Sequence, residues 1–207
     1  MEVVKTRRVE GAQQTRAALL VAATHAFAER GFAAVSMVEI AATANLTKGA
    51  VYHHFTDKTD LFASVLNECN ERAQARVYEA IAKHRDDWWA ATSAALEATL
   101  DVSGDPVAGR LIYLEGPIGL GWRRWRESER HFTHRNVRLV LESGVAAGAF
   151  PDDLPLEAMT HVMSGMVTHS CIAMAEASAR QRKRVRRDLR LAMLRTLRGL
   201  TVGEPPA

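Results

Sequence analysis

The sequence predicts an all-α fold. Aromatic residues make up only 6% of the 207 residues and alanine is abundant, a composition that favours helix over sheet. Apolar residues recur at helical spacing along almost the whole chain, and the sequence has no Asn-Gly or Asp-Gly hairpin turn. Hydrophobic residues make up 47%, which is enough for a sizeable core. Breaks between the periodic segments divide the chain into about nine expected helices.

The first two helices have clear boundaries in the sequence. Helical spacing predicts a first helix over residues 15–30, and Gly31 is a residue that readily takes positive φ at a helix end. The second helix is expected to begin at Ser36, because Ser36 and Glu39 form the S-x-x-E pattern of a capping box. This helix is expected to end near Ala44.

The third and fourth helices begin after residues that cap helices well. Thr47 is the expected N-cap of a short third helix that ends near residue 55. Asp57 is the expected cap of the fourth helix, whose apolar stripe continues to about Lys83. A helix of that length spans about 40 Å.

The C-terminal half is divided by three segments rich in glycine, proline and aspartate. These breaks are DVSGDP (101–106), GPIGLG (116–121) and FPDDLP (150–155). The remaining segments are predicted to be helices near residues 86–101, 106–115, 122–148, 155–178 and 180–200. The last of these is strongly basic, a pattern more typical of a solvated helix face than of a phosphate-binding surface.

The stretch LTKGAVYHHF, residues 46–55, gives the third helix an unusual polar composition. Only two residues separate the end of the second helix from the cap of the third, which is the layout of a helix-turn-helix. In that motif the second helix of the pair enters the DNA major groove. A short core helix with incidental polar residues is the alternative interpretation.

Several side chains of this helix suit contact with DNA. Tyr52 and His53 lie one turn beyond Thr47 and can reach a base edge or a phosphate. Gly49 allows a close approach of the backbone, and Lys48 and Lys58 add positive charge at the two flanks. The stretch therefore predicts a DNA-reading helix.

The span from Thr15 to Leu66, with its core LTKGAVYHHFTDKTDL, resembles the DNA-binding domain of TetR/AcrR-family transcriptional regulators. The resemblance implies an N-terminal helix-turn-helix domain over residues 12–58 and a helical effector-binding and dimerisation domain over residues 59–202. It also implies a homodimer formed through residues about 155–200, and a pseudo-palindromic operator bound by a repressor. The positions that match the DNA-contacting motif are Ser36, Thr47, Lys48, Gly49, Tyr52, His53 and Lys58. Lys5, Arg7 and Arg8 precede the match, as a minor-groove arm or a disordered tail.

An effector pocket is expected among the aromatic and methionine residues of the C-terminal half. Aromatic side chains beside the GPIGLG break suit the wall of an apolar pocket, and methionine suits an adaptable surface. Ordinary core packing is an equally good account of the aromatic residues. The candidate effector-binding residues are Tyr113, Trp122, Trp125, Met163, Met166 and His169.

The sequence offers no catalytic motif, and we expect no enzyme activity, no cofactor and no metal. The histidine pairs at 131 and 134 and at 161 and 169 lack a matching cysteine or carboxylate at ligand spacing. Cys69 and Cys171 frame neither a disulfide nor a zinc pattern, which predicts a reduced, cytoplasmic setting. No apolar run is long enough to predict a membrane span.

Two other functions remain compatible with these patterns. One is a DNA binder without an effector, whose C-terminal half only dimerises. The other is a helical small-molecule-binding or catalytic protein whose helix-turn-helix is vestigial.

Overall fold

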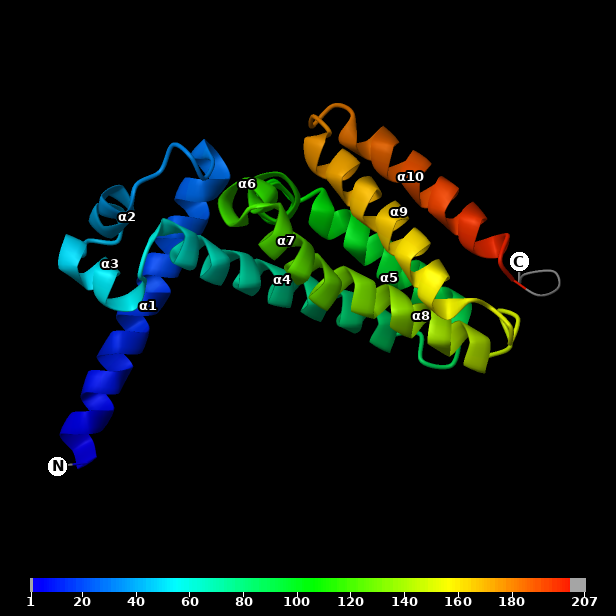
Figure 1. Cartoon of the computed structure of the whole chain (residues 1–207), viewed down its shortest axis with the longest axis horizontal. Coiled ribbons are helices and arrows are strands. Elements are labelled where there is room, and N and C mark those ends of the chain that lie inside the picture. Colours follow the sequence, from blue (N-terminus) through cyan, green and yellow to red (C-terminus); the bar gives the residue numbers. More distant parts are fainter. Residues whose placement is uncertain (1, 202–207) are drawn as a thin grey trace.

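The computed structural model describes the backbone of residues 2–201 and the side chains of residues 11–201. The N-terminal helices are α1 (Glu2–Arg30), α2 (Met37–Thr43) and α3 (Lys48–His54), followed by the long α4 (Lys58–Ala82). Figure 1 shows α2 and α3 at one end of an elongated molecule, with α4 leading from them to the remaining helices. We call α1–α3 the N-terminal unit.

The other helices surround the far part of α4. They are α5 (Trp88–Ser103), the π-helical turn η1 (Arg110–Glu115), α6 (Gly116–Leu120), α7 (Trp122–Glu129), the π-helical turn η2 (Arg130–His134), α8 (Arg135–Ala146), α9 (Leu156–Glu176) and α10 (Arg182–Arg198). Because η1 runs into α6 and α7 runs through η2 into α8, residues 2–201 form nine continuous helices and no strand. The all-α prediction is confirmed.

The predicted helix caps are present. Ser36 and Glu39 form a complete capping box, with the Ser36 hydroxyl accepting from the Glu39 amide at 3.2 Å. The Thr47 hydroxyl accepts from the amide of Ala50, and the Asp57 carboxylate accepts from the amide of Asp60. These caps fix where α2, α3 and α4 begin, and so they set the geometry of the helix-turn-helix.

The first helix is longer than predicted. It begins at Glu2 rather than near Thr15, and its early part extends away from the other helices (Figure 1). The side chains of residues 1–10, which include Lys5, Arg7 and Arg8, lie outside the described residues.

The GPIGLG segment is helical, contrary to the prediction of a break over residues 116–121. Residues 116–120 form α6, and the break is confined to Gly121, whose φ is +76°. The other two glycines are needed for packing. A Cβ on Gly116 would lie 2.7 Å from the Trp125 ring, and one on Gly119 would lie 2.5 Å from the Phe62 ring.

The hydrophobic core of the N-terminal unit continues beyond its three helices. Phe27, Phe32 and Phe62 pack together, with ring centroids 5.1–5.8 Å apart. The same core includes Leu111 of η1 and Trp125 of α7, both buried. The N-terminal unit is therefore packed against the C-terminal half rather than attached by a free linker.

Gly119→Ala tests the contact between α6 and α4. The added methyl group would meet the buried Phe62 ring, so we expect the free energy of unfolding to fall by about 1–3 kcal/mol. Gly11→Ala is the matched control. A Cβ at this exposed helical glycine meets nothing within 4 Å, so stability should rise by about 0.5–1 kcal/mol. Denaturant unfolding measures both variants, and equal effects would contradict the packing argument.

Candidate DNA interface and ligand cavity

The turn between α2 and α3 holds the two helices as a compact pair. Asn45 takes φ +56°, a left-handed conformation that asparagine tolerates well. The Leu46 amide then donates to the Ala41 carbonyl at 2.8 Å. Below the turn, Val51 and Phe55 are buried in the core and hold the inner face of α3. The outer face of α3 is left open to solvent.

This outer face carries the predicted DNA-contacting residues of α3. Lys48, Tyr52 and His53 are exposed, and 47% of the Tyr52 surface is accessible. The Lys48 ammonium lies 5.8 Å from the centre of the Tyr52 ring, so these two side chains share one patch. Beside them a Cβ on Gly49 would meet only the Thr47 hydroxyl oxygen, at 3.8 Å. The face combines a cation, a phenol, an imidazole and an open stretch of backbone.

Ser36 lies at the beginning of α2 and has a structural task. Its amide donates to the Glu39 carboxylate at 2.8 Å, and Arg30 binds the same carboxylate at 2.9 Å. Hydrogen bonds from Ser36, with the nearby Arg30, lower the pKa of Glu39 to about 2. The Ser36 hydroxyl therefore takes part in the cap, and its contact with a phosphate stays a prediction.

Lys58 is partly buried, and its ammonium is bound by groups of the protein. Its ammonium donates to the Phe32 carbonyl at 2.9 Å and to the Ala33 carbonyl at 3.4 Å, and it lies 4.3 Å from the centre of the Phe32 ring. Lys58 therefore joins α4 to the turn between α1 and α2, a role that the sequence did not indicate. Its contact with DNA stays a prediction.

A cavity of about 420 Å³ lies among the helices of the C-terminal half. Its walls come from α4, α5, η1, η2, α8, α9 and α10. Of the six candidate effector-binding residues, Tyr113, Met163 and Met166 line it. Surrounding apolar groups raise the pKa of Tyr113 well above its ordinary value, so its phenol stays neutral.

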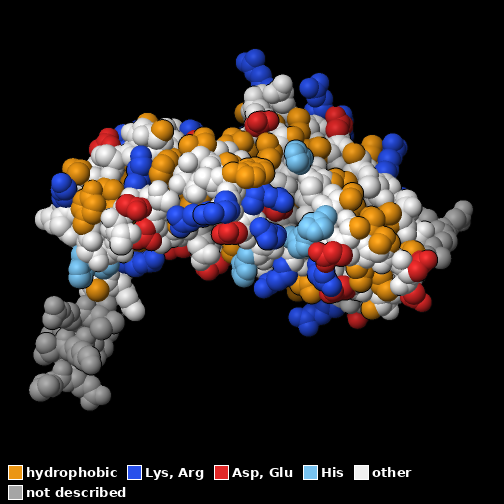
Figure 2. All heavy atoms as spheres, viewed as in Figure 1, with side chains coloured by type: hydrophobic (Ala, Val, Ile, Leu, Met, Phe, Trp, Pro, Cys, Tyr) orange, Lys and Arg blue, Asp and Glu red, His pale blue; other side chains and the backbone are white. Residues whose placement is uncertain are grey.

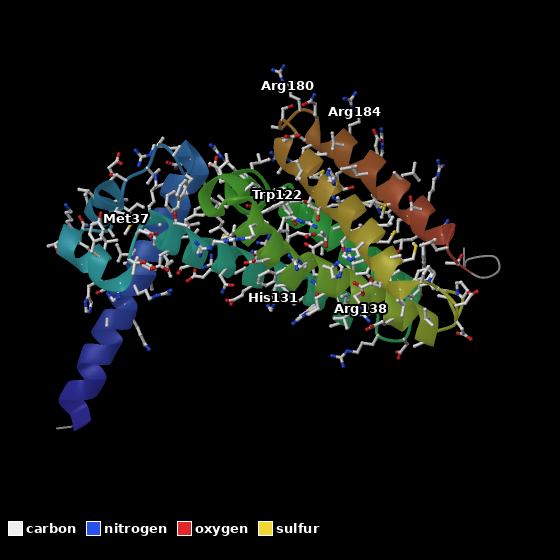
Figure 3. The ribbon with its side chains drawn as sticks, in the orientation of Figure 1. Met37, Trp122, His131, Arg138, Arg180 and Arg184 are labelled. Atoms are coloured by element: carbon white, nitrogen blue, oxygen red, sulfur yellow. The ribbon has the colours of Figure 1, made fainter. Side chains whose placement is uncertain are left out.

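The other three candidates do not line this cavity. Trp125 is a core residue, and its indole Nε1 donates to the Ile112 carbonyl at 2.8 Å. Trp122 is 67% exposed on α7 (Figure 3). His169 is also exposed, with its Nδ1 2.9 Å from the Gly165 carbonyl of its own helix. Spacing along the chain placed Trp122 and Trp125 beside the GPIGLG segment and His169 on the helix predicted near 155–178, but it could not show which way each helix faces.

Polar residues on α4 and α8 line the cavity, and the sequence reasoning missed them. Asn70, Gln74 and Tyr78 follow one another at intervals of four along α4, and Asn136 faces them from α8. Gln74 Nε2 donates to the Tyr78 hydroxyl at 2.8 Å. This polar row can be recognised in the sequence, because residues four apart lie on the same face of a helix. The prediction for this helix rested on its apolar stripe alone and did not include the row.

The turn η1 touches both the cavity and the N-terminal unit. Ile112 and Tyr113 of η1 line the cavity. Glu115, two residues beyond Tyr113, is buried. Its carboxylate accepts from the Phe32 amide at 2.8 Å and pairs with Arg110 at 3.3 Å. Arg110 also donates to the Glu29 carbonyl at the end of α1, at 3.2 Å. One short segment therefore connects the cavity wall to the turn that precedes α2.

Comparison with known proteins covers both halves of the chain. Residues 19–65 match the family described as bacterial regulatory proteins, tetR family. Residues 89–200 match the tetracyclin repressor-like C-terminal domain.

Among relatives, the repressor BepR of Brucella suis is 47% identical over 55 residues, which are 27% of this chain and 26% of BepR. The regulator TtgR of Pseudomonas putida is 42% identical over 65 residues, which are 31% of each chain. These alignments therefore span less than a third of either regulator.

Solved structures match over nearly the whole chain. A TetR-family transcriptional regulator from Pectobacterium atrosepticum has a TM-score of 0.79 at 26% identity, covering 95% of this chain and 98% of that one. RolR in complex with resorcinol has a TM-score of 0.66 at 22% identity, covering 96% and 98%, a likeness of fold. Because the match over residues 89–200 alone covers more than half of the 207 residues, the chain belongs to the tetR family of bacterial regulatory proteins.

Proposed function

We propose that this protein is a ligand-responsive, homodimeric transcriptional repressor that binds a pseudo-palindromic operator and acts in the cytoplasm. The observation that carries the proposal is the outer face of α3, where exposed Lys48, Tyr52 and His53 lie on a helix held by buried Val51 and Phe55. Major-groove readers combine such a rigid helix with a few side chains that reach base edges. Ser36 and Lys48 would contact phosphates, and such contacts position a helix without reading sequence.

Effector control is supported by the cavity and by η1. An effector that binds against Ile112 and Tyr113 would displace η1, and Glu115 would carry the shift to the Phe32 amide. The turn before α2 and the adjacent α4 would then change the spacing of the two reading helices in the dimer. Such linkage between two sites is typically about 1–3 kcal/mol. RolR, a fold neighbour, has resorcinol bound, which supports a small organic effector here.

Dimerisation is proposed through α9 and α10, over residues about 155–200. These helices pack together at one side of the molecule (Figure 1), and Val162 and Leu191 are 63% and 47% exposed on them. Arg186 and Arg190 of α10 instead turn toward α5, where they bind Asp101 and Glu97. Arg180 and Arg184 point away from the body (Figure 3). Exposed apolar side chains on both helices suit a two-fold interface.

The first test is operator recognition by α3. The purified protein is used to select bound sequences from a random DNA pool at a stated salt concentration, and a palindrome is expected. Tyr52→Ala should then weaken binding by about 1–3 kcal/mol, and Lys48→Ala should reduce the salt slope by about 1. Trp122→Ala is the control, because this exposed aromatic lies on α7. Unchanged binding in the α3 variants would contradict the role of this helix.

The dimer interface is tested by placing a charge on its apolar residues. Leu191→Glu should shift the protein from dimer to monomer in sedimentation velocity, since an unpaired charge in an interface is costly. Val21→Glu adds the same charge at another exposed apolar residue, on α1, and should leave the dimer intact. Dissociation by both variants, or by neither, would argue against the α9–α10 surface.

The connection through Glu115 is tested by hydrogen exchange. Glu115→Gln weakens the pairing with Arg110, so amides of the Gly31–Phe32 turn should exchange about 5- to 30-fold faster for a loss of 1–2 kcal/mol. Glu129→Gln is the matched control. Glu129 is equally buried but accepts from Thr168 at 2.7 Å, within the C-terminal half. Equal exchange at the turn in both variants would remove Glu115 from the proposed path.

A further inference from the structure

We propose that the cavity takes an uncharged, largely apolar molecule that carries hydroxyl or carbonyl groups along one edge. This inference rests on the effector-responsive function proposed above and names the chemical class of the effector. The cavity volume of about 420 Å³ lies within the range of small-molecule sites, about 300–1,000 Å³.

The first observation is the chemistry of the lining. Within the part of the chain that the structure describes, no aspartate, glutamate, lysine, arginine or histidine lines the cavity. The chain is nonetheless one-quarter charged, and its charged side chains are dispersed over the visible outer surface among apolar and other groups (Figure 2). Charge is therefore kept out of the cavity although it is plentiful elsewhere.

One carboxylate behind the wall is already paired. Glu129 lies near Tyr113, but its carboxylate binds Arg126 at 2.7 Å and accepts from Thr168 at 2.7 Å. On the outer side the exposed Arg135 donates to the Tyr78 hydroxyl at 3.2 Å without lining the cavity itself. An ionised ligand would thus lose its hydration and meet no counter-ion in the lining, which is a large cost.

The second observation is the arrangement of polar and apolar residues on α4. Asn70, Gln74 and Tyr78 form a polar row, and a neighbouring row of the same helix consists of Ala73, Val77 and Ile81, all of which line the cavity. A ligand lying along α4 would therefore pack an apolar framework against one row. Its polar edge would lie against the other.

The polar row can accommodate a ligand group. The Asn136 Oδ1 is 3.5 Å from Gln74 Nε2 and 3.4 Å from the Tyr78 hydroxyl. Both distances are at the long limit for hydrogen bonds, so a ligand hydroxyl or carbonyl could replace these contacts with shorter ones. Carboxamides and a phenol both donate and accept, and they recognise neutral oxygen groups without needing a charge.

The test compares two fluorescent probes that share one carbon framework. N-phenyl-1-naphthylamine is neutral, and 8-anilino-1-naphthalenesulfonate adds one permanent sulfonate to the same framework. Titration of the full-length protein without DNA should give a dissociation constant on the order of tenfold lower, or better, for the neutral probe. Equal or tighter binding of the sulfonate in the cavity, or no binding of the neutral probe, would overturn the inference.

Two phenylalanine variants test where the neutral probe binds. Ala91→Phe puts a ring into the cavity lining of α5 and should abolish binding of the neutral probe. Ala82→Phe puts the same ring on an exposed residue at the end of α4 and should leave it unchanged. Circular dichroism establishes that both variants fold. Retained binding in Ala91→Phe would place the probe elsewhere and contradict the proposed site.

The polar edge is tested by competition against the neutral probe. The wild-type protein should prefer 4-hydroxybiphenyl over biphenyl by about three- to tenfold, the contribution of one hydrogen bond. Gln74→Leu should remove most of this preference while keeping the affinity for biphenyl. An unchanged preference would overturn the role of the row. Operator selection is measured separately, so loss of DNA binding would reject the proposed function without affecting the probe result.

Discussion

The packing of three aromatic rings between the N-terminal unit and α4 determines how the rest of the molecule is arranged. Phe27 and Phe32 enclose Phe62, and Gly119 gives α6 room to rest on the same ring. The core around them includes residues of η1 and α7, so the three N-terminal helices do not close their own core. The orientation of α3 therefore depends on the C-terminal half. A displacement there would reach α3 through packed side chains rather than through a flexible linker.

Separate hydrophobic clusters hold the helices around the cavity. One joins Leu96 and Leu100 of α5 to Met193 of α10, and another joins Leu141 of α8 to Met163 of α9. Neither cluster fills the space that faces the polar row of α4, and the cavity occupies it. Leu96, Met193, Leu141 and Met163 themselves line the cavity, so the two clusters hold the helices around this space.

The sequence predicted those features whose causes are local. The Ser36 and Thr47 caps bind amides three residues ahead, so a short pattern reveals them. The partners of Trp125, Glu115 and Lys58 are 13, 83 and 26 residues away, and no local pattern could reveal them. Three of the six candidate effector-binding residues do not line the cavity, and no local pattern could reveal this, because the side of a helix that faces a cavity is decided by distant helices.

Both π-helical turns lie beside the cavity. Ile112 and Tyr113 of η1 and Phe132 and Thr133 of η2 all line the cavity, so each turn contributes to its wall. A π-helical turn is rare and is often found at functional sites. Since η1 also carries Glu115, which holds the Phe32 amide, an irregular part of the cavity wall is directly connected to the N-terminal unit. In the proposed function, a small ligand bound at this wall would reach the orientation of α3 through η1 and Glu115 while the buried aromatic core stays intact.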